Sequence, residues 1–124
     1  MGLNETIKEI LQHEAPLGIV TVGRGKAHFV ATWNSFVLVV DDKTIAIPAG
    51  GMVQTEKNVN GGSDVQLMVA SKKVQGLQGM GTGFRLTGKA EFQGEGEIYE
   101  AIKSKFPWAR AVAVVSVIKT EQLV

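Results

Sequence analysis

Short apolar runs separated by turn residues recur along the chain, and this alternation constrains the fold more than any other feature. The runs are rich in valine, isoleucine and alanine and are bounded by glycine, aspartate or asparagine, as β-strands joined by tight turns are. Strands that follow one another through hairpins leave unpaired edges, which closure into a barrel removes. We therefore predict a mainly β protein, an antiparallel barrel of six to seven strands over residues 17–22, 27–31, 36–40, 44–47, 65–70, 84–92 and 111–118.

Three segments carry helical signals instead. Residues 1–13 repeat apolar side chains at helical spacing and precede Pro16, residues 52–58 have room for two turns, and residues 95–106 carry glutamates early and lysines late. Residues 75–83 are rich in glycine and predict a flexible loop. The sequence has no repeat, linker or low-complexity segment, so we expect a single domain over residues 1–124, with three short helices.

Composition excludes several classes of function. The chain has 124 residues, no cysteine and a net charge of +1, so disulfides, thiolate zinc sites and a cysteine nucleophile are excluded. The charges are interspersed without the basic face of a nucleic-acid-binding protein, and no apolar run has the length of a membrane span. We therefore expect a cytoplasmic protein without a nucleic-acid or membrane partner. Only 20% of the residues are charged, which favours a surface partly covered by a second subunit or a ligand.

The sequence matches two nucleotide-binding motifs only incompletely and contains no recognisable metal site. Residues 83–90 have the glycine and lysine spacing of a phosphate-binding loop, but Ala90 stands where a hydroxyl must hold magnesium. Residues 79–83 lead into a strand and not into a helix, which argues against a dinucleotide-binding turn. His13 and His28 have no acidic residue or cysteine at ligand spacing, so we predict no metal site and assign no catalytic residue.

Two segments interrupt the strand pattern with polar, aromatic and glycine residues: Thr32-Trp33-Asn34-Ser35 and Pro48-Ala49-Gly50-Gly51-Met52. A site for a flat polar ring and a phosphate needs an aromatic surface, hydrogen-bonding groups and a turn that lets the backbone approach. The second segment leads into the helix at 52–58, whose free N–H groups attract an anion. Trp108 follows the last helix, where ligand contacts are common. Core packing is the alternative for both tryptophans.

The order and spacing of several blocks together resemble one family, the small bacterial FMN-binding proteins of the split-barrel class, which are related in fold to pyridoxamine 5′-phosphate oxidase. The resemblance extends over nearly the whole chain. Its blocks are Thr32 to Ser35, Pro48 to Met52, Thr55-Glu56, Ser71-Lys72-Lys73-Val74, Gly81-Thr82-Gly83-Phe84 and Lys105-Phe106-Pro107-Trp108-Ala109-Arg110. It implies that the predicted barrel is a split β-barrel.

The resemblance also implies a homodimer with one FMN per subunit at the interface. The implied cofactor-binding residues are Thr32, Trp33 and Asn34 along the flavin ring, Pro48, Ala49, Gly50, Gly51 and Met52 beside it, Gln54 and Thr55 at the phosphate together with Ser71, Lys72, Lys73 and Val74, Trp108 on one side, and Val124 reaching in from the partner. Gln54 departs from the pattern, because a relative carries lysine there, and Lys57 or Lys72 could compensate for the lost charge.

The function implied is an electron carrier or a small FMN-dependent oxidoreductase with an unknown redox partner. FMN would perform the redox chemistry while the protein supplies binding and electrostatics. The alternatives are an oxidase like pyridoxamine 5′-phosphate oxidase, a nicotinamide-dependent flavin reductase, and a flavin-binding module without turnover.

Overall fold

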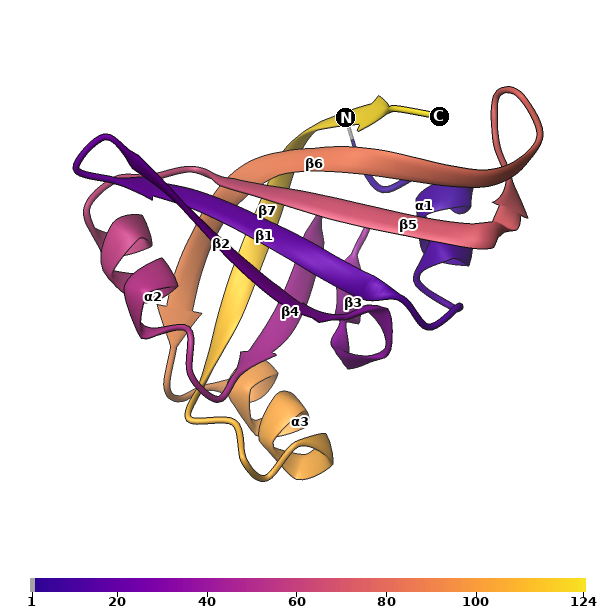
Figure 1. The fold of residues 1–124 in the computed structure, drawn as a ribbon. Coiled ribbons are helices and arrows are strands. Elements are labelled where there is room, and N and C mark those ends of the chain that lie inside the picture. The colour runs from indigo at the N-terminus through magenta and orange to yellow at the C-terminus, as the bar shows by residue number, and fades with distance from the viewer. Residues whose placement is uncertain (1) are drawn as a thin grey trace.

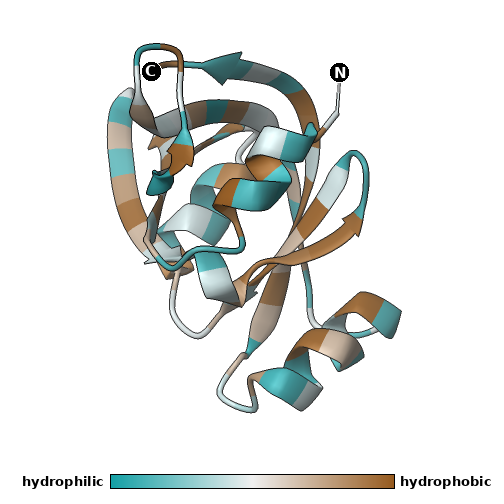
Figure 2. Ribbon diagram, turned by 90° about the vertical axis from the view of Figure 1, so that its right-hand side faces the viewer, coloured by the Kyte–Doolittle hydropathy of each residue, from teal (hydrophilic) through white to brown (hydrophobic). Residues whose placement is uncertain are grey.

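Seven antiparallel strands form one strongly curved sheet in the order β2-β1-β5-β6-β7-β4-β3 (Figure 1). The computed structural model describes residues 2–124. Each strand alternates apolar and polar residues or is apolar throughout, as strands that cover a core do (Figure 2). The strands are β1 (Pro16–Gly23), β2 (Lys26–Trp33), β3 (Leu38–Asp41), β4 (Thr44–Ala49), β5 (Val65–Gln75), β6 (Met80–Gln93) and β7 (Ala111–Gln122).

The helices lie against the outside and the ends of this sheet. They are α1 (Glu5–Ile10), α2 (Val53–Asn60) and α3 (Glu97–Lys105), with a 3₁₀ turn η1 (Asn34–Phe36) between β2 and β3. α1 begins where the Asn4 side chain accepts the N–H of Ile7 at 2.8 Å, α2 contacts β1 and β6, and α3 contacts β4 and β7. Among residues 2–124, none of the helices is long and apolar enough to cross a membrane.

The barrel is split because its two edge strands do not pair with each other. β2 and β3 end the sheet at opposite sides, and η1 carries the chain from one edge to the other. β3 pairs with β4 only as far as Leu38 and Ala46, so the last residues of β4 have an open edge. Pro48 lies there, and its lack of an N–H group costs no ladder bond on that side. Beyond Ala46, β4 therefore has no strand partner on the β3 side within residues 2–124.

The core is the apolar interior of the curved sheet. Its largest fully buried side chains include Ile7 and Ile10 of α1, which close one end, and a second cluster around Ile102 lies beneath α3. Gly88 lies at a close approach between two strands: a Cβ there would press on the backbone oxygen of Ser116, and the register of β6 against β7 shifts at this point.

The mainly β, antiparallel architecture with three helices is confirmed, but one predicted loop is wrong. Residues 75–83 do not form a long flexible loop, because β6 already begins at Met80 and pairs with the end of β5. Gly79 and Gly81 have positive φ angles, so these glycines serve a tight turn. The helix predicted over residues 1–13 is shorter in the structure, where α1 covers Glu5–Ile10 with Leu11 as its C-cap. Residue 1 of the predicted range lies outside the described residues.

Candidate functional site

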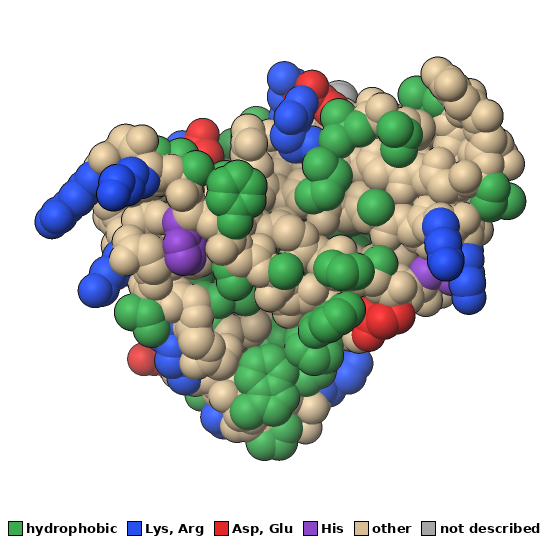
Figure 3. Space-filling model, in the orientation of Figure 1, with side chains coloured by type: hydrophobic (Ala, Val, Ile, Leu, Met, Phe, Trp, Pro, Cys, Tyr) green, Lys and Arg blue, Asp and Glu red, His purple; other side chains and the backbone are tan. Residues whose placement is uncertain are grey.

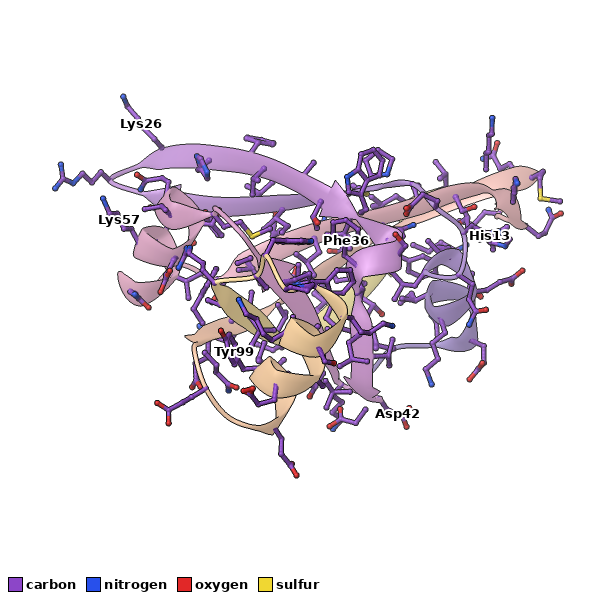
Figure 4. The ribbon with its side chains drawn as sticks, turned by 90° about the horizontal axis from the view of Figure 1, so that it is seen from below. His13, Lys26, Phe36, Asp42, Lys57 and Tyr99 are labelled. Carbon is purple, nitrogen blue, oxygen red and sulfur yellow. The ribbon has the colours of Figure 1, made fainter. Side chains whose placement is uncertain are left out.

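Three aromatic rings meet where η1 passes α3. The ring centroid of Phe36 lies 5.0 Å from that of Phe106 and 5.5 Å from that of Trp108, and the latter two are 5.6 Å apart. All three pairs are tilted, a favourable arrangement for aromatic quadrupoles. Figure 4 shows Phe36 between η1 and α3, and Figure 3 shows apolar side chains gathered over α3. Trp108 remains 51% exposed, so the cluster presents an aromatic surface to solvent.

A glycine turn lies against this aromatic cluster. A Cβ on Gly50 would lie 3.0 Å from Cε3 of Trp108, so glycine lets the ring rest on the turn. Gly51 has nothing within 4 Å of its Cβ position and is open to a ligand. Arg110 fixes the turn: its Nε and Nη2 donate to the Gly51 oxygen at 3.0 and 2.6 Å, and its Nη1 donates to Glu56 at 2.8 Å. Pro48 and Ala49 are buried.

The start of α2 lacks protein partners for its polar groups. Met52 is the N-cap residue, in the left-handed region at φ 57°, and its side chain provides no cap. Within residues 2–124, the N–H groups of Val53, Gln54 and Thr55 have no acceptor, and the buried hydroxyl of Thr55 has no partner. Orphaned donors at a helix start, together with a buried hydroxyl, fit an anionic group supplied from outside the protein. These residues therefore fit the phosphate of a cofactor.

The residues of the first polar segment divide between surface and interior. Trp33 ends β2 opposite Pro16 and is 46% exposed. Asn34 is fully buried, and its Nδ2 donates to backbone oxygens of Ile10, His13 and Ala70 at 3.3, 3.0 and 3.4 Å. The amide of Asn34 thus ties η1 to α1 and β5, a structural task that its polar character alone did not reveal.

Glu14 lies beside this segment with a defined charge. Its carboxylate accepts the hydroxyl of Ser35 at 2.6 Å and the N–H of Ser35 at 3.1 Å. These two bonds lower the pKa of Glu14 because they stabilise the ionised form. The carboxylate is therefore ionised at neutral pH, next to the turn that follows Trp33.

Ser71 to Lys73 lie in a different cavity from Gln54. They line a space of about 290 Å³ together with residues 13–16, whereas Gln54 lines a space of about 570 Å³ between α2 and the β1–β2 turn. Ser71 lies six positions along β5 from Val65, the first residue of the strand, which is about 20 Å at 3.3 Å per residue. Val124 is held near that far end, because its oxygen accepts the Thr82 hydroxyl at 2.7 Å, and Thr82 pairs with Ser71.

The predicted site residues thus form two groups within one chain. The aromatic rings, the glycine turn and the start of α2 form the first group, and residues 71–74 with Val124 form the second. Sequence reasoning missed Arg110, the clamp on the turn, and Arg24, which lines the cavity of Gln54. A sequence signal for Arg24 existed, since arginine is unusual in a hairpin turn.

Comparison with known proteins places this geometry in a family. The family model described as pyridoxamine 5′-phosphate oxidase matches residues 3–123. An FMN-binding protein of Nitratidesulfovibrio vulgaris (strain DSM 19637 / Miyazaki F) is 43% identical over 117 residues, covering 94% of this chain and 95% of that protein.

Solved structures agree on the fold. HupZ of Group A Streptococcus matches with a TM-score of 0.81 at 21% identity, covering 98% of this chain and 94% of that one. An FMN-binding protein from Syntrophomonas wolfei subsp. wolfei matches with a TM-score of 0.73 at 17% identity, covering 94% of this chain and 88% of that one. The resemblance drawn from the sequence is thereby confirmed, and the chain belongs to the pyridoxamine 5′-phosphate oxidase family of split barrels.

Proposed function

We propose that this protein binds FMN and carries electrons between redox partners. The observation that carries the proposal is the uncapped start of α2, where orphaned N–H groups and the buried hydroxyl of Thr55 adjoin the glycine turn beneath Trp108. A phosphate suits the first feature and a flat ring suits the second. The relative with 43% identity is itself an FMN-binding protein, which supports the same cofactor.

The residues of the first group, together with Thr32, Trp33 and Asn34 at the junction of β2 and η1, divide the work of binding. Trp33 and Trp108 offer aromatic surface to the flavin ring, and Gly51 leaves room for the ring to approach the backbone. Gln54 and Thr55 offer N–H groups and a hydroxyl to the phosphate. Close neighbours complete the walls mainly through their backbone: Thr32, Asn34, Pro48, Ala49, Gly50 and Met52.

Electron transfer fits this site better than substrate-specific catalysis. When bound, FMN supplies one-electron and two-electron redox chemistry, and the protein supplies position and charge. Trp33 and Trp108 are each about half exposed, so the site is shallow enough for a protein partner to come close to the ring. Arg110, the charged side chain that clamps the glycine turn, is already occupied by three hydrogen bonds to Gly51 and Glu56.

A homodimer would join the two groups of site residues. Residues 71–74 and Val124 lie apart from the start of α2 in one chain, but a two-fold partner can bring its own copies to the first group. Many large apolar side chains are exposed and available for such an interface: Val22, Phe29, Trp33, Val39, Val40, Val53, Met68, Leu77, Met80, Trp108, Ile118, Leu123 and Val124. A cysteine-free chain of this kind suits the reducing cytoplasm.

An absorption spectrum of the purified protein tests the proposed function. We expect flavin bands, or saturable binding when FMN is added to colourless protein, with quenching of the flavin fluorescence by the tryptophans. A protein without flavin bands that also fails to bind added FMN would refute the proposal. Turnover with pyridoxamine phosphate or with a nicotinamide donor would instead favour an oxidase or reductase, and FMN that no donor reduces would favour a binding module.

A further inference from the structure

The cavity between α2 and the β1–β2 turn offers cationic side chains that could hold a phosphate, although position 54 is glutamine and not lysine. It measures about 570 Å³ and is lined by Val22, Gly23, Arg24, Gln54, Lys57, Asn58 and Gly61. Two of these residues are cationic and none is acidic. Figure 3 shows lysine and arginine side chains gathered at this end of the molecule, and Figure 4 shows Lys57 extending there beside the hairpin.

Lys57 is placed to reach the start of α2. It lies three residues after Gln54, about 4.5 Å along the helix axis at 1.5 Å per residue. Side chains of a helix lean toward its N-terminus, so that of Lys57 covers the turn that holds Gln54. Its ammonium group can therefore replace a charge lost at position 54.

Arg24 occupies a turn position that arginine rarely takes. Arg24 and Gly25 have φ angles of 52° and 76°, and positive values at both residues are what a type I′ hairpin turn requires. Asparagine or glycine favours that geometry, whereas in the left-handed region the Cβ of most other residues lies too close to the following carbonyl oxygen. The turn itself gains nothing from arginine, so the reason for the residue lies in its charge.

A buried hydrogen-bond chain holds the hairpin to α2 and so keeps Arg24 near Lys57. Nε2 of Gln54 donates to Oδ1 of Asn58 at 2.8 Å, and Nδ2 of Asn58 donates to Oγ1 of Thr21 at 3.0 Å. Asn58 and Thr21 are both buried, and glycine at position 23 leaves room for the Asn58 side chain. These hydrogen bonds therefore fix the hairpin against α2, with Arg24 in the lining of the cavity.

The other charges nearby do not cancel this positive potential. Glu56, the acidic residue in the first turn of α2, is paired with Arg110 at 2.8 Å. Within residues 2–124, neither Arg24 nor Lys57 belongs to an ion pair. Lys72, the other lysine that could compensate, lines the distant cavity that Glu14 also lines. The positive end of the helix dipole adds to the two free cations.

We propose that Arg24 and Lys57 together supply the positive charge that holds the FMN phosphate, in place of a lysine at position 54. The inference rests on the proposed FMN function and deepens it. It predicts that these two residues distinguish FMN from riboflavin, which has the same ring but no phosphate.

Equilibrium binding of FMN and of riboflavin to Arg24→Asn and Lys57→Gln tests this inference. Each variant should bind FMN about tenfold more weakly, the loss of one charged hydrogen bond, and riboflavin within about twofold of the wild type. Asparagine suits the type I′ turn, so Arg24→Asn should melt no lower than the wild type. Lys57→Arg keeps the positive charge and should bind FMN as tightly as the wild type. The FMN affinity of Arg24→Asn and of Lys57→Gln should depend less on salt than that of the wild type.

Lys43→Gln is the matched control, because it removes an equivalent exposed charge at the β3–β4 turn, away from both cavities. The inference is overturned if Arg24→Asn and Lys57→Gln leave FMN binding unchanged, if they weaken both flavins equally, or if Lys72→Gln alone removes the preference for FMN. A wild-type protein that binds neither flavin refutes the FMN function itself, and this inference with it. A wild-type protein that binds both flavins with equal affinity refutes only the phosphate site.

Discussion

Two adjacent residues, Trp33 and Asn34, show how a polar segment divides its tasks at the scale of the residue. Trp33 faces solvent, while Asn34 is fully buried and serves three backbone oxygens. The sequence predicted a polar interruption here, and the structure confirms one. It could not indicate which residue faces inward, because an amide is satisfied as well by buried carbonyls as by a ligand.

Replacing Asn34 therefore tests a structural task. Asn34→Ala leaves the oxygens of Ile10, His13 and Ala70 without that donor, and we expect the free energy of unfolding to fall by about 1–3 kcal/mol. Asn34→Asp should cost more, since it places a carboxylate against the same oxygens. Urea denaturation measures both, with Asn60→Ala as control, because Asn60 is exposed and its side chain makes no hydrogen bond within residues 2–124. A fully stable Asn34→Asp protein would contradict this role.

Replacing Trp33 tests the exposed half of the segment. Trp33→Ala should weaken FMN binding by about 1–3 kcal/mol, the usual cost of losing an aromatic stacking surface. The thermal midpoint should change little, because the side chain is already 46% exposed. Trp33→Phe keeps a ring and should lose less. Fluorescence titration with FMN supplies the dissociation constants, and equal constants for the alanine variant and the wild type would remove Trp33 from the site.

At the scale of the element, glycines in strands and turns serve different purposes that a substitution can separate. Gly88→Ala should destabilise the protein strongly, because its Cβ would press on the backbone oxygen of Ser116. Gly51→Ala should leave stability unchanged, since nothing lies within 4 Å of its Cβ position, yet weaken FMN binding if the ring passes there. Thermal melts and FMN titrations of both variants make the comparison. Unchanged FMN binding by Gly51→Ala would place the ring elsewhere.

The Glu14 carboxylate, in the connection after α1, joins that connection to the 3₁₀ turn η1 through its hydrogen bonds from Ser35, and its charge depends on pH. The bonds from Ser35 lower the folded-state pKa of Glu14 below its ordinary value of 4.5. A lowered pKa contributes stability that is complete above the unfolded value and is lost as pH falls through the folded value. Glu14→Gln should therefore lower stability at neutral pH, and the difference from the wild type should shrink below about pH 4. Urea midpoints at several pH values measure this difference, and a constant gap would contradict it.

For the whole molecule, local signals predicted the elements but not their neighbours. Turn residues marked the hairpins, and the helix signals at 52–58 and 95–106 correspond to α2 and α3. Nothing local indicates that β7 lies between β6 and β4, or that β5 pairs with β1, because these contacts join distant segments. The cavity of Arg24 and Lys57 depends on such a contact, since the hairpin and α2 meet only in the folded chain. The sequence therefore indicated the polar and glycine segments of the candidate site but not the cavity that Arg24 and Lys57 line.

The division of site residues into two groups leads to a prediction about assembly. If one FMN contacts both subunits, FMN binding and dimerisation must strengthen each other by the same factor, because binding energies are linked reciprocally. Sedimentation velocity should show a species of twice the chain mass of 13.3 kDa, and added FMN should shift its dissociation to lower protein concentration. FMN affinity should correspondingly weaken on dilution. A monomer that binds FMN with the same affinity at every protein concentration would mean that one chain holds the cofactor alone, and that residues 71–74 and Val124 have no part in the site.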